Sequence, residues 1–269
     1  MKIAFLQYDV HHDKERNFQL IQQHLDMLTC DLLVLPELSL CGYLFKNQDE
    51  PAAAAESIPA GPSVARMAEL SRLYDCAILF GMAKKEKDHL YNTAVLVSQG
   101  EYCGRYRKMH LSDFEKTLFE PGTENPVFEV MGIRIGVQIC FDLWFPEVSR
   151  EQILQEAQLL CVLANFGGET TSRIAPVRAI ENLTPLVLCN RIGHEFLPEL
   201  DASFLGKSAV YGADEQCLTG EVPQQELLGV LEISLPSKRS NVICRDFLAE
   251  MSVHYQDVVN KVPLPVNNA

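Results

Sequence analysis

The sequence has little positive charge and no long apolar run. Its 269 residues include 23 Lys and Arg against 36 Asp and Glu, which gives a formal net charge of −13. Nucleic acids and anionic membrane surfaces are bound through clustered Lys and Arg, so this balance argues against both as partners. No stretch of about 18 apolar residues is present, and the first apolar run, residues 3–6, is too short for a signal-peptide core. We therefore expect a cytoplasmic protein that spans no membrane.

The cysteines do not form a recognisable framework. There are nine, an odd number, and no two are spaced as C-x-x-C. Disulfide scaffolds and zinc sites need paired or closely spaced ligands, and the seven His do not supply them. We expect no metal ion and no organic cofactor. Most of the cysteines, such as Cys161 in the apolar run 159–163, are expected to be small buried hydrophobes.

Apolar runs of strand length alternate with segments of helical periodicity, which predicts an α/β fold. No Pro-, Gly- or Ser-rich linker divides the chain, so we expect one domain over residues 1–269. The tail from about residue 237 has weaker patterning and is expected to pack against a partner subunit or to be partly disordered. The predicted strands are 2–7, 31–36, 77–82, 91–97, 101–106, 133–139, 159–163, 186–188, 207–211 and 228–233; the predicted helices are 14–28, 63–73, 146–157 and 173–182.

Cys140 follows a predicted strand, residues 133–139, and precedes a predicted helix that begins at Pro146. In α/β proteins ligands bind at the carboxyl edge of the sheet, and backbone N–H groups after such a turn can face a developing oxyanion. A cysteine at this place is a candidate nucleophile. Buried structural cysteines are commoner than catalytic ones, so position alone leaves both interpretations open.

Glu37 and Lys108 also follow predicted strands. Glu37 lies among leucines in the sequence, and partial desolvation raises the pKa of a carboxyl group, as a general base near neutral pH requires. The ammonium of Lys108 is able to stabilise negative charge on a carbonyl oxygen. His110 is an alternative partner for a cysteine, because Cys–His is the commoner nucleophile pair. Spacing along the chain does not exclude it.

Three segments together resemble the nitrilase superfamily of carbon–nitrogen hydrolases, in their order along the chain. Residues 35–43 (LPELSLCGY) are similar to its glutamate motif, residues 106–111 (YRKMHL) to its lysine motif and residues 136–147 (GVQICFDLWFPE) to its cysteine motif. Three further and independent matches lie at 114–122, 178–193 and 204–208, so that the resemblance runs from the first strand to about residue 220.

The resemblance implies a four-layer α-β-β-α sandwich that is usually paired across subunits, so a homodimer or higher homo-oligomer is expected. It implies that Glu37 is the general base, Cys140 the nucleophile and Lys108 the group that stabilises the tetrahedral intermediate. Glu115 corresponds to a second glutamate that positions the substrate, with Glu120 as the alternative.

Further residues are expected around these. The backbone N–H of Phe141 is expected to hold the oxyanion, together with Lys108. Tyr43, Asn165 and Phe166 are expected to form pocket walls. Asp142, beside the nucleophile, is expected to orient the turn rather than to take part in the chemistry.

The implied reaction is hydrolysis of a non-peptide amide C–N bond of a small molecule through a Cys140 thioester, with release of ammonia or an amine. Nitrile-hydrolysing relatives tend to have Trp-Glu after the cysteine, whereas this chain has Phe141 and Asp142, which favours the amidase and carbamoylase branches. An N-carbamoyl-amine hydrolase, a nitrilase, an acyltransferase and a non-catalytic binding or scaffold protein remain alternatives. Acidic residues in the segments expected to shape the pocket favour a neutral or cationic amide, unless they are simply solvated; they are Asp113, Glu169, Glu195, Glu199 and Asp201.

Overall fold

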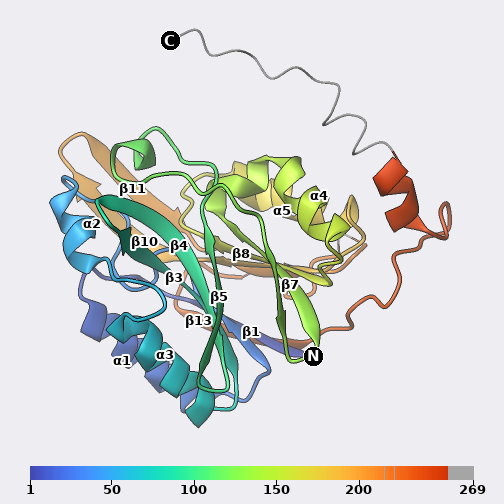
Figure 1. Ribbon diagram of the computed structural model, residues 1–269, viewed down its shortest axis with the longest axis horizontal. Coiled ribbons are helices and arrows are strands. Elements are labelled where there is room, and N and C mark those ends of the chain that lie inside the picture. Colours follow the sequence, from blue (N-terminus) through green and yellow to red (C-terminus); the bar gives the residue numbers. More distant parts are fainter. Residues whose placement is uncertain (215, 221, 254–269) are drawn as a thin grey trace, which may run out of the picture.

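Two stacked β-sheets form the centre of the computed structural model, which describes residues 1–214, 216–220 and 222–253 (Figure 1). The six strands of the first sheet lie in the order β13 (Leu227–Glu232), β1 (Lys2–Gln7), β2 (Leu32–Val34), β3 (Ala77–Glu86), β4 (His89–Ser98) and β5 (Glu101–Arg107). The five strands of the second lie in the order β12 (Ala209–Tyr211), β9 (Leu186–Asn190), β8 (Leu159–Ala164), β7 (Ile133–Ile139) and β6 (Val127–Val130).

Helices cover the outer face of each sheet and complete four layers. Apolar side chains of α1 (Lys14–Leu25) and α3 (Pro62–Leu73) pack on the first sheet, and those of α5 (Glu169–Ile180) and α4 (Pro146–Leu154) pack on the second. Figure 1 shows these helix pairs on opposite sides of the stacked sheets. The predicted α-β-β-α sandwich is confirmed.

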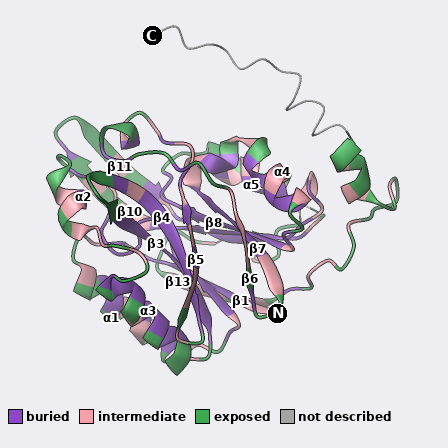
Figure 2. Cartoon of the chain, in the orientation of Figure 1, coloured by how far each residue is buried: buried purple, intermediate pink, exposed green. Residues whose placement is uncertain are grey.

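The strands are buried on both faces, and alternate side chains enter different parts of the core. In β8, Cys161 and Leu163 pack between the two sheets, whereas Leu160 and Val162 pack against the helices. Figure 2 shows the buried residues concentrated in the strands and on the inner sides of the helices. Strands covered on both faces need apolar side chains on both, which explains why they appear in the sequence as uninterrupted apolar runs. The prediction that Cys161 is a buried core residue is confirmed.

Parallel strands bring several strand ends to one edge of the molecule. Strands β1, β2 and β3 are parallel in the first sheet, as are β7, β8 and β9 in the second. The predicted hairpin of β4 and β5 is confirmed, with Ser98 paired to Glu101 across the turn. This hairpin returns the chain so that Lys108 follows β5 at the same edge of the sheet at which β2 ends, with β3 and β4 between them.

The differences from the predicted elements are mostly at their ends. Helix α1 stops at Leu25 instead of residue 28, α4 stops at Leu154, and α5 begins four residues early, at Glu169. The patterns in the sequence did not predict α2 (Asp49–Ala54), β6 or the hairpin of β10 (Ile192–Leu197) and β11 (Leu200–Leu205). Most residues of the hairpin strands are exposed or half-buried, so the strands carry neither an apolar run nor a clear alternation.

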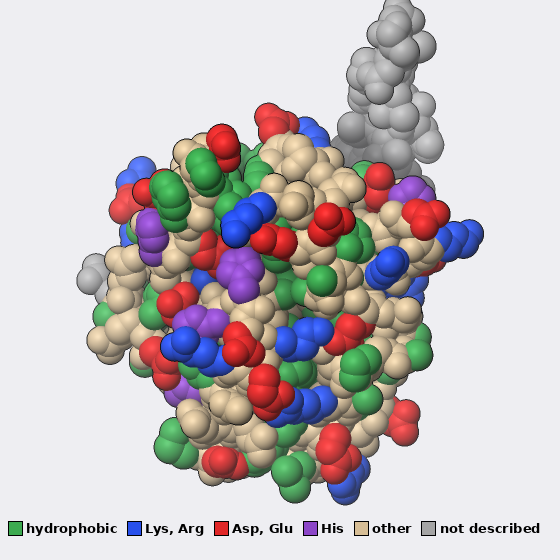
Figure 3. All heavy atoms as spheres, turned by 90° about the vertical axis from the view of Figure 1, so that its left-hand side faces the viewer, with side chains coloured by type: hydrophobic (Ala, Val, Ile, Leu, Met, Phe, Trp, Pro, Cys, Tyr) green, Lys and Arg blue, Asp and Glu red, His purple; other side chains and the backbone are tan. Residues whose placement is uncertain are grey.

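The surface carries charges of both signs. On the face that Figure 3 shows, acidic, basic and histidine side chains are interleaved with apolar ones. Within the described residues no helix is both long enough and apolar enough to cross a bilayer.

Candidate active site

Glu37 lies three residues after the end of β2, where the chain passes close to β3. Leu35 N donates to Leu79 O at 2.8 Å, which keeps the chain beside β3 after β2 has ended. A Cβ atom on Gly81 of β3 would lie 2.4 Å from Leu38 N and 2.7 Å from Pro36 O, so only glycine fits there. The side chain of Glu37 is consequently fully buried.

Lys108 connects Glu37 to a second carboxylate. Its Nζ atom donates to Glu37 Oε1 at 2.7 Å and to Glu115 Oε1 at 2.6 Å. Glu115 begins a short 3₁₀ helix (Glu115–Thr117) and accepts from Ser112 N at 3.0 Å through its other oxygen. All three charged side chains are buried. The alternative, Glu120, is exposed and lies 3.7 Å from the ring of His89, so the structure brings Glu115 and not Glu120 to Lys108.

Asn92 of β4 is a member of this cluster that the sequence analysis missed. Its Nδ2 atom donates to Glu37 Oε1 at 2.6 Å and to Glu115 Oε1 at 3.1 Å. Nothing in the local pattern distinguishes Asn92 from an ordinary polar strand residue. Its relation to Lys108 arises from the β4–β5 hairpin, in which Lys108 N also donates to Asn92 O at 2.9 Å.

The cluster divides one positive charge between two carboxyl groups. Burial raises the pKa of Glu37 to about 7; Lys108 opposes this rise and Glu115 adds to it. For Glu115, burial acts in the same direction, but Lys108 and the Ser112 hydrogen bonds outweigh it and hold its pKa below the usual value. Burial alone would lower the pKa of Lys108, yet the two carboxylates hold it well above the usual value. Near neutral pH the cluster therefore contains an ammonium, an ionised Glu115 and a Glu37 that can gain or lose a proton.

Cys140 directly follows β7 and begins a 3₁₀ helix (Cys140–Trp144), with a backbone φ of 47°. A non-glycine residue in this left-handed region stores strain, which commonly marks a functional position. The half-buried thiol has a raised pKa because of burial and the charge of Glu37; Lys108 and the backbone N–H of Asn165 act in the opposite direction. The resting group is a neutral thiol beside a carboxylate that is able to accept its proton.

Asp142 fixes the turn that presents Cys140, as expected. Its carboxylate accepts from Ile139 N at 3.1 Å, from the hydroxyl of Tyr106 at 2.8 Å and from His110 N at 2.8 Å. The His110 ring lies 3.0 Å from the same carboxylate and stacks on Phe145 at a centroid distance of 3.7 Å. His110 thus supports the turn, while the cluster around Lys108 is built from carboxylates.

A cavity of about 530 Å³ borders the cluster. Tyr43 and Asn165, both expected in the pocket wall, line it, whereas Phe166 packs its ring into the apolar core beneath the second sheet's helices. Among the described residues, the buried polar atoms without a hydrogen-bond partner include three groups at this site: Glu37 Oε2, Asn92 Oδ1 and both atoms of the Asn165 amide. Buried polar atoms without partners are uncommon in folded proteins, so these indicate where a ligand is received. The lining residues are Tyr43, Leu44, Ser112, Phe114, Asn165, Gly167, Leu200, Asp201, Ala202, Ser203 and Phe204.

The charged residues expected near the pocket have different positions. Of the lining residues, all within the described part of the chain, Asp201 alone is charged. Asp113 pairs with Lys116 at 2.8 Å, and Glu169 pairs with Arg173 at 2.6 Å, both at the surface. Glu195 is instead mostly buried. Among the described residues, no group of three or more His, Cys, Asp or Glu is placed to hold a metal ion.

Phe141 follows Cys140 in the 3₁₀ helix, and its ring packs against Trp144 and Phe145 at centroid distances of 5.6 Å and 5.2 Å. These contacts hold the peptide after Cys140 in place, where its N–H was expected to face an oxyanion. In α5, Arg178 pairs with Glu181, the residue that caps the helix, at 2.9 Å.

Known proteins are similar to this chain in sequence and in fold. The family model described as carbon-nitrogen hydrolase matches residues 2–240. A protein named nitrilase from Pyrococcus abyssi is 37% identical over 205 residues, which cover 76% of this chain and 77% of that protein. The N-carbamoylputrescine amidase of Solanum lycopersicum is 29% identical over 221 residues, 74% of each chain.

A solved structure shows the same architecture. A mutant of the amidase from Nesterenkonia sp. AN1, which carries acrylamide added at its active-site cysteine, superposes with a TM-score of 0.79 and 25% identity over 97% of this chain and 100% of that one. The family match, the sequence relatives and the four-layer fold agree. The chain therefore belongs to the carbon–nitrogen hydrolase family of the nitrilase superfamily.

Proposed function

We propose that this protein hydrolyses an amide C–N bond of a small molecule through a thioester on Cys140. The observation that carries the proposal is the buried Glu37–Lys108–Glu115 cluster, in which Glu37 Oε2 has no hydrogen-bond partner within the described residues. The charge of Glu37 also raises the pKa of the Cys140 thiol, so the two groups interact. A base with a pKa near 7 is suited to take the proton of such a thiol at neutral pH.

In the proposed first half of the reaction, Glu37 takes the Cys140 proton and the sulfur forms a bond to the substrate carbonyl carbon. The negative charge on the carbonyl oxygen is stabilised by Lys108 and by the backbone N–H of Phe141. The C–N bond then breaks, and the proton held by Glu37 goes to the departing ammonia or amine. Asn92 donates to Glu37 and Glu115 accepts from Lys108, so these two residues hold the Glu37 carboxylate and the Lys108 ammonium in fixed positions.

In the second half, Glu37 takes a proton from water, and the oxygen adds to the thioester carbonyl. Collapse of this intermediate breaks the C–S bond, and the sulfur regains a proton from Glu37 as the carboxylic acid leaves. Each half uses Glu37 once as a base and once as an acid. A carboxyl group with a pKa near the working pH suits both roles.

N-carbamoyl-amine hydrolysis is a second candidate. The cavity wall contains an acidic residue, Asp201, and no Lys or Arg among its described residues, which disfavours a substrate with a carboxylate at its far end. A relative named N-carbamoylputrescine amidase is in agreement with a ureido substrate. A ureido carbonyl would follow the same steps, with carbamate in place of the carboxylic acid.

We also propose that the protein is cytoplasmic and forms a homodimer or higher homo-oligomer, with the tail from residue 237 at the subunit interface. Val242 and Ile243 in this tail have their side chains almost completely exposed, as expected of residues that a partner covers. Residues 254–269, including the Pro-rich end, lie outside the described residues. If the tail joins subunits, removal of residues 237–269 should lower the number of subunits per particle, measured as molar mass by light scattering.

The direct test is a screen of small amides, N-carbamoyl amines and nitriles for ammonia release. Cys140→Ala should abolish turnover, and Cys103→Ala, which alters a half-buried cysteine of β5, should retain it. Mass spectrometry of the intact protein should detect an acyl adduct on the wild type but not on Cys140→Ala. Faster transfer to added hydroxylamine than to water would favour an acyltransferase. If nothing is turned over and no adduct forms, the protein is a binding or scaffold member of its family.

A further inference from the structure

The pocket wall that contains Tyr43 is a thin loop between two cavities. Leu44 lines both the cavity of about 530 Å³ beside the cluster and a second one of about 750 Å³ between α2 and the β10–β11 hairpin. Tyr43 lines the first. The Tyr43 ring packs against Phe114 and Phe204, at centroid distances of 5.9 Å and 6.0 Å. Polar contacts to the loop backbone add to this packing.

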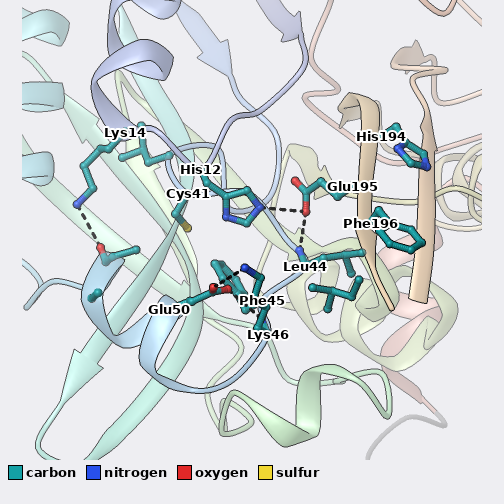
Figure 4. A pocket seen from close by; sticks show the side chains of 14 residues that line it. His12, Lys14, Cys41, Leu44, Phe45, Lys46, Glu50, His194, Glu195 and Phe196 are labelled. Carbon is teal, nitrogen blue, oxygen red and sulfur yellow. Dashed lines mark hydrogen bonds and ion pairs between the residues drawn. The ribbon is translucent and has the colours of Figure 1, made fainter. Parts of the chain in front are cut away.

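Glu195 of β10 supplies these contacts to the loop backbone. Its Oε2 atom accepts from Leu44 N at 2.6 Å and from Tyr43 N at 3.0 Å, and its Oε1 atom lies 3.3 Å from Tyr43 N. Figure 4 shows the carboxylate reaching from the hairpin to the loop, with the ring of His12 on its other side. Glycine precedes the loop, and Gly42 has a φ of 75°. Two successive N–H groups thus point at one carboxylate.

Arg191 holds Glu195 and, at the same time, a second pocket wall. Its guanidinium is fully buried, contacts Glu195 and donates to Asp9 Oδ1 at 3.0 Å. Its central carbon also lies 4.2 Å from the ring centroid of Phe204. Phe204 meets the Tyr43 ring edge to face, at a centroid distance of 6.0 Å and an interplanar angle of 88°. One buried cation therefore supports both aromatic walls of the pocket.

The network is ionised at neutral pH. Burial would raise the pKa of Glu195, but His12, Arg191 and the loop N–H groups outweigh it and lower this pKa to about 2. Charge-assisted hydrogen bonds of this kind are stronger than neutral ones. Within the described residues, Glu195 contacts Tyr43, Leu44, His12 and Arg191 rather than the Glu37–Lys108–Glu115 cluster, so its effect on the site passes through the loop.

We propose that Glu195 is a positioning residue that sets the distance between Tyr43 and Phe204, and thereby the fit of the non-reacting part of the substrate. This inference rests on the proposed amide hydrolysis. A substrate too small to reach the two rings should not depend on Glu195, whereas one that extends between them should.

The test compares acetamide with an amide of five or six carbons in wild type, Glu195→Gln and Glu195→Asp. In Glu195→Gln the charge is lost; in Glu195→Asp the charge opposite Arg191 stays, but the shorter side chain cannot reach both N–H groups. We expect KM for the long amide to rise about tenfold in both variants, and kcat/KM for acetamide to stay within about twofold. Glu199→Gln and Glu199→Asp, in the exposed turn of the same hairpin, are matched controls that should behave as wild type.

The extent to which limiting iodoacetamide alkylates Cys140, located by mass spectrometry of peptides, gives the fraction of competent sites for each preparation. If both substrates lose rate equally after this correction, or if the Glu195 variants match the Glu199 variants, Glu195 has no positioning role. If the wild type itself turns over no amide, the proposed function fails and this inference fails with it. Because Glu195→Asp keeps the ion pair with Arg191, it remains a valid test if Glu195→Gln does not fold.

Discussion

The Nζ atom of Lys108 lies 2.7 Å from Oε1 of Glu37, although the two residues are 71 positions apart in the chain. Both side chains are buried, so each charge depends on the other and on Glu115 for compensation. The second oxygen of Glu37 is left without a partner within the described residues. The pair therefore combines a fixed cation with a carboxylate that has one oxygen left for a further partner.

Activity should depend on the ionisation of Glu37. Because a base must be unprotonated, kcat/KM of the wild type should fall as pH decreases below about 7. Glu37→Gln should lower kcat by about 100-fold or more at every pH and abolish this fall in kcat/KM at acid pH, the acid limb of the profile. A pH–rate profile between pH 5 and 9 measures both effects. A wild-type profile that stays flat down to pH 5 would argue against Glu37 as the base.

The same pKa predicts a change in stability with pH. The folded state binds the Glu37 proton more tightly than the unfolded state, so the wild type should lose stability as pH rises from about 4.5 to about 7. At about 1.4 kcal/mol per pKa unit, the loss relative to Glu37→Gln is up to about 3 kcal/mol. Urea unfolding of both proteins at pH 5 and pH 7.5 measures this difference. An equal change in the two proteins would contradict it.

Lys108→Met should affect both catalysis and stability. It removes the oxyanion stabiliser, for which a loss of about 100-fold to 1000-fold in kcat is expected. It also leaves two buried carboxyl groups without their cation, which should cost about 3–5 kcal/mol of unfolding free energy. Lys116→Met is the matched control, because its ammonium is exposed and, among the described residues, pairs with exposed Asp113; a change below about 0.5 kcal/mol is expected. Comparable losses in both variants would refute a special role for Lys108.

Asn92→Ala should raise the apparent pKa of the acid limb. Its amide donates to Glu37 and lowers the pKa of that carboxyl group, so removal favours the protonated form. We expect the limb to move to higher pH and kcat/KM at pH 7 to fall about tenfold. Asn47→Ala, at an exposed position, should leave the profile unchanged. A lower rate without a displaced limb would mean that Asn92 acts on Lys108 or on the fold alone.

Gly81→Ala should destabilise the protein by about 2–3 kcal/mol and reduce activity, because its Cβ would press on the backbone on either side of Glu37. Gly168→Ala has no atom within 4 Å of the new Cβ and should cost less than about 1 kcal/mol. Thermal unfolding of both variants gives the comparison. If Gly81→Ala unfolds like Gly168→Ala, the close passage does not constrain Glu37.

The sequence by itself determined the sandwich, most of its strands and the identity of the three candidate catalytic residues. Uninterrupted apolar runs predict doubly buried strands such as β8, and the motifs around Glu37, Lys108 and Cys140 resemble one family in order and spacing. The β10–β11 hairpin was not predicted, because its mostly exposed and half-buried residues give no apolar run and no clear alternation. Helix ends were displaced by a few residues for a similar reason, since the last turn of a helix has little packing to reveal it.

Only the tertiary structure decided which side chains share the site. Asn92 joins Glu37 through strand pairing, and Glu115 rather than Glu120 reaches Lys108 because one carboxylate points inward and the other to solvent. Glu195, in a segment of apparently solvated acids, is held by a buried Arg191. These contacts join residues from different elements, and burial then sets their pKa values. Local sequence carries no record of either, because both depend on what the rest of the chain places nearby.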